Sequence, residues 1–413
     1  MSPGPRPLRV AVVCDYPEEH WPSMDLVGEM ILTHLHSGHA GAVEAERVCP
    51  PFRHRHTRLP VIGRSAAARN ADRLVNRFHD YPRALRRLAG TSRFDLYHLV
   101  DHSYSQLVHA LPPGRAVVTC HDLDTFRCLF EPALEPRSRW FRAMTGRILA
   151  GLKRAAAIVC DSVATRNALA ARRIITTDRL HVVPLGLSPE FTADPEPRHD
   201  AEAARLLGPA GPADLLHVGS NIPRKRVDVL LSVFATVRQA RPGARLIKVG
   251  GPLPPDLDQK ARDLGVSDAM LTLPFVDRHV LAAVYRRVAL VLLPSDAEGF
   301  GLPAIEALSC GAPLLASDLP VLRAVAGDAA TYRPVGDVAA WSAAALTLLD
   351  EPRHAAAVSA ARRVAGQARG HLFSWSAHAD RLVAIYREVI SRPDVAPPGA
   401  TSVTIPARRL PPT

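Results

Sequence analysis

Short apolar runs alternate with stretches of helical spacing along almost the whole chain. The runs are apolar nearly throughout, which is typical of parallel strands that helices cover on both faces. Two such series follow one another, so the pattern predicts an α/β protein with two doubly wound, Rossmann-like domains. The predicted strands span residues 8–15, 43–48, 94–100, 116–119, 157–160 and 180–183, then 215–218, 245–249, 270–273, 289–293, 313–316 and 330–333. The predicted helices span 23–36, 66–88, 137–154, 163–170, 227–239, 255–264, 277–286 and 304–308.

The change from one series to the next sets the expected domain boundaries. A polar, proline-rich stretch over 188–199 is typical of an interdomain linker. We therefore expect one domain at 1–187 and a second at 188–373. Trp375, Leu382 and Tyr386 recur at helical spacing and predict a terminal helix within 374–392. Residues 393–413 are rich in Pro, Ala and Thr, and we expect them to be disordered.

The composition is that of a globular protein, with 413 residues, 47% hydrophobic and 22% charged. No apolar run approaches the ~20 residues that a membrane-spanning helix needs. The first apolar run ends at Cys14 and Asp15, and we interpret it as a buried strand and not as a signal peptide. We therefore expect a cytoplasmic protein. The six cysteines are scattered without a C-x-x-C pair, which favours free thiols over disulfides or a metal site.

The formal net charge of +11 is unevenly distributed. Ten arginines lie between Arg53 and Arg87, with only Asp72 and Asp80 as acidic neighbours. A basic helix from Arg64 to Arg87 would suit an anionic membrane surface, which would make the protein peripheral at the inner face of the membrane. The pattern equally fits a solvated helix, because the chain has only four lysines and uses arginine almost everywhere for positive charge.

The stretch 294–307 is the most informative part of the sequence. Glu298 and Glu306 lie eight residues apart, on either side of a Gly-Phe-Gly turn and Pro303. Proline suits the first position of a helix, so we expect free N–H groups from Gly301 to Ala304 to form an anion site. Carboxylates beside an anion site fit a nucleotide sugar, whose phosphates accept and whose hydroxyls donate hydrogen bonds. The alternative is a solvated loop carboxylate followed by an ordinary first-turn glutamate.

A second cluster of candidates follows the predicted strand 215–218. Gly219 and Ser220 begin a turn, and Arg224 and Lys225 supply adjacent positive charges that would stabilise a departing diphosphate. The alternative is a solvated basic helix start. After strand 245–249, a glycine pair at Gly250 would permit a close approach of the backbone to a ligand, or would only form a turn.

These stretches resemble the retaining glycosyltransferases of family 4, which have the GT-B fold. The resemblance rests on the sequence EGFGLP from Glu298 onward, on Glu306, and on the Cys-Gly-Ala-Pro turn that begins at Cys310. Lys225 and Arg224 also match a basic family motif, although Ser220 stands where many members have arginine. The resemblance covers nearly the whole second domain and, more loosely, the first.

The resemblance implies transfer of a hexose from a nucleotide-diphosphate sugar, such as GDP-mannose or a UDP-hexose, to a hydroxyl of a glycan or lipid-linked acceptor. It implies retention at the anomeric carbon, no metal ion, no cofactor, and a terminal helix that returns to the first domain. Catalytic roles fall to His121, Glu298, Lys225 and Arg224. The donor-binding residues would be Gly219, Ser220, Gly250, Val276, Gly299, Phe300, Gly301, Leu302 and Glu306.

The candidates of the first domain follow predicted strands. His121 matches a family histidine that contacts the transferred sugar, and it follows strand 116–119. Asp101 and His102 follow strand 94–100 and would contact the acceptor; equally, Asp101 would only cap the next helix. Ser23 lies where many members carry two glycines, and it could cap the next helix while presenting N–H groups to the acceptor.

Two other functions compete with this interpretation. A Rossmann oxidoreductase or epimerase should carry G-x-G-x-x-G after the first strand, where this chain has Cys14, Asp15 and Tyr16. A non-catalytic anion- or nucleic-acid-binding protein on the same fold is supported only by the basic region. We therefore expect an enzyme that binds no nucleic acid.

Overall fold

The computed structural model describes residues 6–60, 63–209, 211 and 213–392. The predicted tail at 393–413 lies outside this part of the chain. The chain forms two compact units. The first comprises Met1–Val159, Arg172–His181 and Ala379–Thr413, and the second comprises Cys160–Ala171 and Val182–His378.

The first sheet has the strand order β2-β1-β3-β4-β5-β6. β1 pairs in parallel with β2 and β3, and β3 pairs in parallel with β4. The strands are β1 (Leu8–Val13), β2 (Val43–Val48), β3 (Leu96–Leu99), β4 (Ala116–Cys120), β5 (Ala157–Cys160) and β6 (Leu180–Val182). β1 is the point where the order reverses, because the chain first moves to one side of β1 and then to the other.

The second sheet has the order β12-β11-β10-β7-β8-β9, and its pairs are all parallel. Its strands are β7 (Asp214–Val218), β8 (Arg245–Val249), β9 (Met270–Leu273), β10 (Leu290–Leu293), β11 (Leu314–Ser317) and β12 (Thr331–Arg333). This is the strand order of a classical Rossmann domain, with its reversal between β7 and β10.

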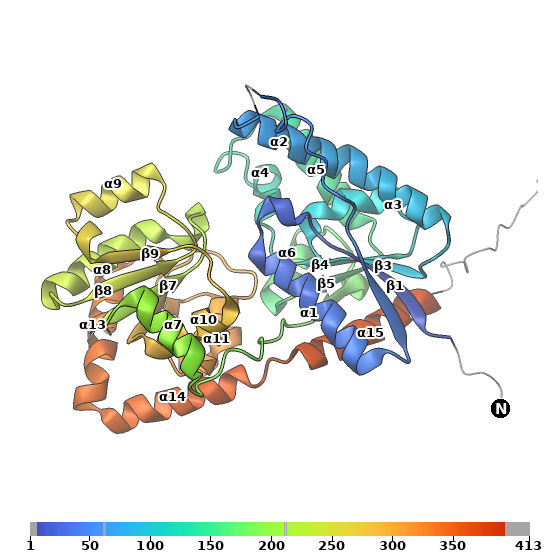
Figure 1. Ribbon diagram of the computed structural model, residues 1–413. Helices are drawn as coiled ribbons and strands as arrows, with labels where there is room; N and C mark the ends of the chain where they lie inside the picture. Colours follow the sequence, from blue (N-terminus) through green and yellow to red (C-terminus); the bar gives the residue numbers. More distant parts are fainter. Residues whose placement is uncertain (1–5, 61–62, 210, 212, 393–413) are drawn as a thin grey trace, which may run out of the picture. The chain divides into compact units, whose positions relative to one another are not determined.

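Helices lie on both faces of each sheet (Figure 1). Those of the first series are α1 (Pro22–His39), α2 (Ala66–Val75), α3 (Tyr81–Gly90), α4 (Arg127–Phe130), α5 (Arg139–Lys153) and α6 (Val163–Ala171). The second series has α7 (Pro197–Leu207), α8 (Val227–Ala240), α9 (Pro255–Asp263), α10 (Arg278–Arg287), α11 (Leu302–Ser309), α12 (Pro320–Ala326), α13 (Val338–His354) and α14 (Ala356–Gly370). The last helix is α15 (Trp375–Ser391). Among the described helices, none is both long enough and apolar enough to cross a bilayer.

The last helix belongs mainly to the first unit. Its residues from Ala379 onward cluster with that unit. Tyr386 is buried, and a hydrogen bond joins its hydroxyl to Nδ1 of His98 on β3. The terminal helix therefore returns to the first sheet after the second unit is complete.

The predicted linker over 188–199 is wrong at its end. Helix α7 begins at Pro197, and Phe191 within the stretch is buried. Proline at a first helical position starts a helix as readily as it marks a loop, because the missing N–H costs nothing there. In the structure, Cys160–Ala171 belongs to the second unit, which resumes at Val182.

The predicted helix 66–88 is interrupted. A π-helical segment, Asn76–Asp80, separates α2 from α3. Pro82 lies just beyond this segment and has no N–H to donate to the carbonyl four residues earlier, which accounts for the irregular turn.

Candidate functional site

The strand order places the strongest candidates at one edge of the second sheet. Ligands of open α/β sheets bind beyond the carboxyl ends of the strands where the order reverses. In this sheet the reversal falls between β7 and β10, which are paired neighbours. Lys225 follows β7 and Glu298 follows β10, so the topology alone brings both to this point.

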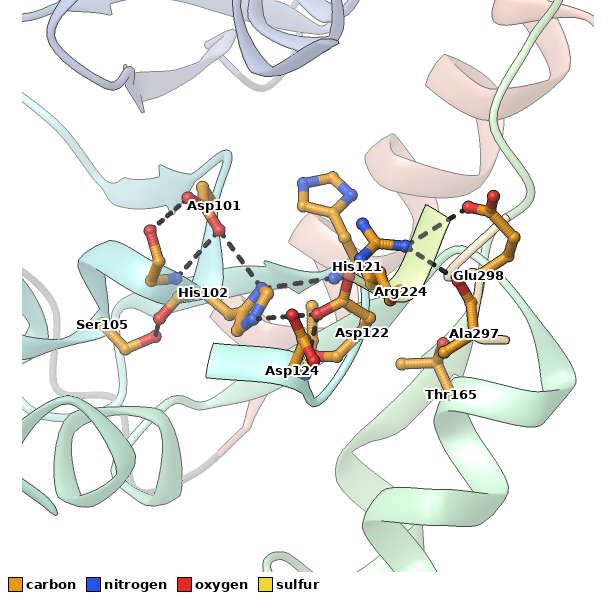
Figure 2. A network of polar contacts seen from close by, with 12 residues as sticks. Asp101, His102, Ser105, His121, Asp122, Asp124, Thr165, Arg224, Ala297 and Glu298 are labelled. Atoms are coloured by element: carbon orange, nitrogen blue, oxygen red, sulfur yellow. Dashed lines mark hydrogen bonds and ion pairs between the residues drawn. The ribbon is translucent and has the colours of Figure 1, made fainter. Parts of the chain in front are cut away.

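Glu298 is the centre of a buried polar cluster. Its Oε1 accepts hydrogen bonds from Lys225 Nζ at 2.6 Å and from Ser295 Oγ at 2.7 Å. Its Oε2 lies 3.4 Å from Arg224 Nη1, which also donates to the carbonyl of Ala297 at 2.9 Å (Figure 2). Only 5% of the Glu298 side chain is exposed. The structure therefore brings three of the predicted catalytic residues into direct contact.

The cluster keeps the Glu298 carboxylate ionised. Burial alone would raise the pKa of Glu298, but Lys225, Arg224 and the hydrogen bond from Ser295 outweigh it and lower that pKa below its usual value. An ionised carboxylate accepts hydrogen bonds and does not donate them. Glu298 is therefore suited to bind hydroxyl groups.

Glu306 lies on α11 in a different environment. It is 7% exposed, and the Tyr285 hydroxyl donates a hydrogen bond to its Oε2 at 2.9 Å. Burial raises the pKa of Glu306 to about 7, although Tyr285, Arg278 and Lys225 act in the opposite direction. Lys225 thus acts on both glutamates, but only Glu306 changes its charge near neutral pH.

The start of α11 differs from the prediction in two details. The helix begins at Leu302, so Pro303 is its second residue. The N–H of Ala304 is not free, because it donates to the carbonyl of Gly301 at 2.9 Å. Proline has no N–H, so the expected anion site is reduced to the N–H groups of Gly301 and Leu302. Gly301 has φ of 94°, a conformation that favours glycine.

Phe300 has a structural role that the motif did not reveal. Its side chain is 4% exposed and packs edge-to-face on Phe373, with the ring centroids 5.4 Å apart. Gly299 beside it is also buried. A ligand could therefore reach only the backbone of this part of the motif.

The glycine turns after β7 and β8 pack directly against each other. A Cβ atom at Gly250 would lie 2.2 Å from the carbonyl oxygen of Gly219, and Gly250 has φ of 123°. No side chain fits at this position. Ser220 lies in the first of these turns and is partly exposed, and Val276 is partly exposed in the loop between β9 and α10. These predicted donor-binding residues therefore lie on consecutive loops at the same edge of the sheet.

The reversal point of the first sheet also carries buried acidic residues. Asp15 follows β1 and Asp101 follows β3; they are 3% and 7% exposed. Burial and the neighbouring Asp101 raise the pKa of Asp15 well above its usual value. Asp101 accepts a hydrogen bond from the Ser103 N–H at 2.8 Å and lies 3.2 Å from Nδ1 of the buried His102 (Figure 2). Asp101 thus caps the 3₁₀ helix His102–Ala110, as the alternative interpretation of the sequence proposed. The predicted contacts of Asp101 and His102 with an acceptor stay predictions.

The local surroundings of His121 and Ser23 are set by neighbouring residues of the first unit. His121 is 8% exposed, and its Nε2 lies 2.8 Å from the carbonyl oxygen of Val100, so the chain itself fixes its ring. Ser23 does not cap α1: the helix begins at Pro22, and Trp21 occupies the capping position without a side-chain hydrogen bond. The prediction that Ser23 caps this helix is wrong, because Pro22 supplies an earlier start.

The basic region of the first unit is only partly exposed. Arg77 donates to the carbonyl and hydroxyl oxygens of Ser103, and both Arg77 and Arg73 form ion pairs with the buried Glu19. The guanidinium of Arg77 also lies 4.0 Å from the centroid of the Tyr104 ring. Arg77 is therefore an internal residue of the fold. The exposed arginines between Arg53 and Arg87 are Arg53, Arg58, Arg64, Arg69, Arg83, Arg86 and Arg87.

Sequence reasoning missed several polar residues near these positions. Lys248 and His217 are fully buried in the second sheet, and Tyr285 bonds to Glu306. A signal existed for Lys248, because two of the four lysines in this arginine-rich chain belong to one site. The pairing of Asp15 with Asp101 had no local signal, since 86 residues separate them.

One group of described residues has the composition of a metal site. Possible ligand atoms of Glu196, His199 and His279 lie within 4.8 Å of one another. Nδ1 of His199 is 2.7 Å from Oε1 of Glu196, and Nδ1 of His279 is 3.3 Å from Oε2. Despite desolvation, the two histidines lower the pKa of Glu196. Ion pairing thus accounts for the group, and none of its members is among the predicted site residues.

Two family models match the chain, and together they cover most of both units. The model "Glycosyltransferase Family 4" matches residues 31–191, and the model "Glycosyl transferases group 1" matches residues 200–364. The second match contains the whole Glu298 cluster.

Curated relatives match about half of the chain. A protein of Segniliparus rotundus named D-inositol 3-phosphate glycosyltransferase is 36% identical over 207 residues, which is 48% of this chain and 45% of that protein. A protein of Thermobispora bispora with the same name is 35% identical over 263 residues, which is 59% of this chain and 60% of that protein. The chain thus spans roughly half the length of the curated relatives it matches.

Solved structures share the fold over nearly the whole chain. The sucrose-phosphate synthase of Thermosynechococcus elongatus has a TM-score of 0.71 at 19% identity, covering 92% of this chain and 99% of that one. Alr3699/HepE of Anabaena in complex with UDP and glucose has a TM-score of 0.65 at 16% identity, covering 92% of this chain and 100% of that one. At such identities the likeness shows the fold alone, and it confirms the predicted two-domain α/β architecture.

Proposed function

Because the chain belongs to the family 4 type of glycosyltransferases with the GT-B fold, we propose that it is a retaining glycosyltransferase that uses a nucleotide-diphosphate hexose. The observation that carries the proposal is the contact of Glu298 with Lys225 and Arg224 at the reversal point of the second sheet. A carboxylate for hydroxyl groups and two cations for phosphates match the two chemical parts of such a donor.

In the proposed reaction, Lys225 and Arg224 stabilise the negative charge of the departing nucleoside diphosphate. Stabilisation of charge that develops in the transition state lowers the barrier directly. Glu298 binds hydroxyl groups of the sugar, and Glu306 binds those of the ribose. His121 contacts the transferred sugar. We propose front-face attack by the acceptor hydroxyl, because no candidate nucleophile was evident in the sequence.

The proposed reaction uses no metal ion. Lys225, Arg224 and the N–H groups of Gly301 and Leu302 take the place that a divalent cation would have beside the diphosphate. The carboxylates of this cluster are engaged with the chain's own donors, Glu298 with Lys225 and Glu306 with Tyr285.

The donor and the acceptor are the least defined parts of the proposal. We propose a UDP-hexose or GDP-mannose as donor; Alr3699/HepE, which has this fold, has been solved with UDP-glucose. The predicted acceptor is a glycan or a lipid-linked hydroxyl. Since several curated relatives are named D-inositol 3-phosphate glycosyltransferase, an inositol phosphate is a further acceptor to test.

A lipid-linked acceptor would fit peripheral contact with an anionic membrane. The exposed Arg83, Arg86 and Arg87 lie on α3. In the same unit, Phe78 and the 62% exposed Trp140 line an apolar hollow, and arginine with exposed aromatic residues suits the headgroup region of a bilayer. Co-sedimentation with anionic liposomes tests this proposal, and equal binding of a variant with all three arginines changed to Glu would contradict it.

The decisive experiment is a screen of nucleotide sugars for donor hydrolysis and transfer, beginning with UDP-glucose and GDP-mannose. We expect release of the nucleoside diphosphate with at least one donor and retained anomeric configuration in the product. Tight binding of nucleotides or nucleic acid without turnover of any donor would instead favour the non-catalytic binding protein.

A further inference from the structure

The second sheet contains a buried positive charge that the proposed reaction does not use. Lys248 lies near the carboxyl end of β8, is 0% exposed, and is paired in register with His217 on β7. Its ammonium donates hydrogen bonds to the carbonyl oxygens of Gly219 at 3.1 Å and Gly251 at 3.2 Å. A buried ammonium is costly unless the protein or a ligand compensates it, so its presence requires an explanation.

We propose that Lys248 is a positioning residue for the diphosphate of the nucleotide-sugar donor: it joins the two glycine turns beneath the donor and supplies a positive charge that only the bound phosphates balance. This inference rests on the proposed function and deepens it. Lys248 itself does not touch the reacting atoms.

The geometry of the turns supports the positioning role. The peptide unit is planar and trans, so a carbonyl that points toward Lys248 directs the N–H of the same peptide unit to the opposite side. The carbonyl of Gly219 therefore fixes the direction of the Ser220 N–H. Within the described part of the chain, this N–H makes no hydrogen bond, which leaves it for a ligand. The two turns also lie in direct backbone contact, since a Cβ atom at Gly250 would collide with the carbonyl of Gly219.

The charges around Lys248 support the second part of the proposal. Among the described residues, no carboxylate forms an ion pair with it, and burial lowers the pKa of Lys248 to about 8. Three titratable groups face this region from neighbouring elements: His217 on β7, Lys225 after β7, and Glu298 after β10. Burial together with Lys248 and Lys225 lowers the pKa of His217 to about 3, so His217 is neutral at physiological pH. Glu298 is already engaged with Lys225.

The amino-acid composition gives an independent reason to single out this residue. The chain contains four lysines, and the two that are buried, Lys225 and Lys248, lie at this one edge of the sheet. A lysine can be buried as a compact charge and can lose its proton, whereas arginine stays charged and needs a planar set of partners. A chain that otherwise prefers arginine therefore retains lysine where that difference matters.

The test measures the affinity of UDP and GDP for the 413-residue chain by calorimetry. For the wild type, the affinity should fall as pH rises through about 8, because the bound phosphates favour charged Lys248 and deprotonation removes that charge. Lys248→Met should bind the nucleotides about tenfold or more weakly and should lose this pH dependence. A residue that only held the turns together would weaken binding equally at every pH, so the pH dependence near 8 separates the two roles.

Two controls separate the possible failures. Lys260→Met, on α9 of the same unit, should leave affinity and pH dependence unchanged. A measurement on the wild type alone is also decisive: nucleotide binding at about pH 8.5 should take up protons, visible as a dependence of the heat on the buffer. Absent proton uptake, or wild-type affinity and pH dependence in Lys248→Met, would overturn this inference alone. A wild type that binds neither nucleotide would overturn the proposed function as well.

Discussion

Replacement of Glu298 by glutamine separates the proposed function from its rivals. The carboxylate accepts hydrogen bonds from Lys225 at 2.6 Å and Ser295 at 2.7 Å in a site where it is 5% exposed. Glutamine has nearly the same shape and keeps one oxygen as an acceptor, but it cannot balance the charge of Lys225 or Arg224. The change therefore removes the charge while preserving most of the packing.

The expected loss of stability is moderate. A hydrogen bond to a charged group contributes about 1.5–3 kcal/mol and a neutral one about 1 kcal/mol, so Glu298→Gln should cost about 1–2 kcal/mol. Glu298→Ala removes one partner of a buried ion pair and should cost about 3–5 kcal/mol. Glutamine is therefore the better variant for activity measurements, since alanine confounds loss of function with loss of stability.

The expected loss of activity is larger. If Glu298 binds the sugar more strongly in the transition state than in the ground state, turnover should fall at least about a hundredfold, or about 2.7 kcal/mol. The affinity for UDP or GDP should not fall, because Lys225 and Arg224 are released from the carboxylate and can pair with the phosphates. Turnover is measured as nucleotide release from the active donor, and Asp256→Asn, an exposed carboxylate on α9, serves as the control. Turnover within a few-fold of the wild type in a folded Glu298→Gln variant would refute the assignment.

Four further predictions concern the second unit and its proposed reaction. Burial raises the pKa of Glu306 to about 7, so protonated Glu306 stabilises the fold fully below the unfolded pKa, and this stabilisation is lost as pH rises through 7. Glu306→Gln should therefore be more stable than the wild type by up to about 3 kcal/mol above pH 7. Chemical denaturation at several pH values measures this difference. Tyr285→Phe should raise that pKa further, moving the pH dependence upward in the same assay. Gly250→Ala should abolish nucleotide binding measured by calorimetry, because its Cβ would lie 2.2 Å from the Gly219 carbonyl. Dialysis against EDTA should leave turnover unchanged, and loss of turnover that a divalent cation restores would contradict the metal-independent reaction.

The strands of this protein could be predicted almost completely from its sequence. Strands β2, β5, β8 and β9 begin and end at the predicted residues. For β5, which is buried at every residue, this agreement has a physical cause: a parallel strand covered on both faces is apolar, so it stands out against the polar loops around it. The order of the strands within each sheet then determines which loops meet, although no local pattern contains that order.

The helices were predicted less well where alanine replaces larger apolar residues. Helices α13 and α14 were not predicted, and both are rich in alanine, which favours helix but marks no apolar face. Helix α7 was not predicted because Pro197 was interpreted as part of a linker, whereas proline can also begin a helix. The segment Asn76–Asp80 shows the same difficulty, since a proline within a helical pattern does not say how the chain adjusts.

The residues of the candidate site also differ in how far the sequence predicts them. The motif residues Glu298, Glu306 and Lys225 could be found from the spacing of the glutamates together with the family resemblance of both motifs. Tyr285, which acts on the pKa of Glu306, could not be found in this way, since it reaches the site from α10 through a tertiary contact. A contact between distant segments depends on strand register and turn conformation, and neither has a local signal.

Glu306 and Lys248, whose pKa values burial shifts toward neutral pH, predict opposite effects of pH on donor binding. Glu306 accepts hydrogen bonds from hydroxyl groups best when ionised, which requires a pH above about 7. Lys248 supports the phosphates when it is charged, which requires a pH below about 8 in the free protein. In the free protein, Glu306 is ionised and Lys248 is charged at the same time only in a narrow pH interval near neutrality. Donor affinity should fall on both sides of this interval. Because burial is the largest cause of both shifts, the same exclusion of water that strengthens the Glu298 ion pairs also narrows the pH range in which the site can work.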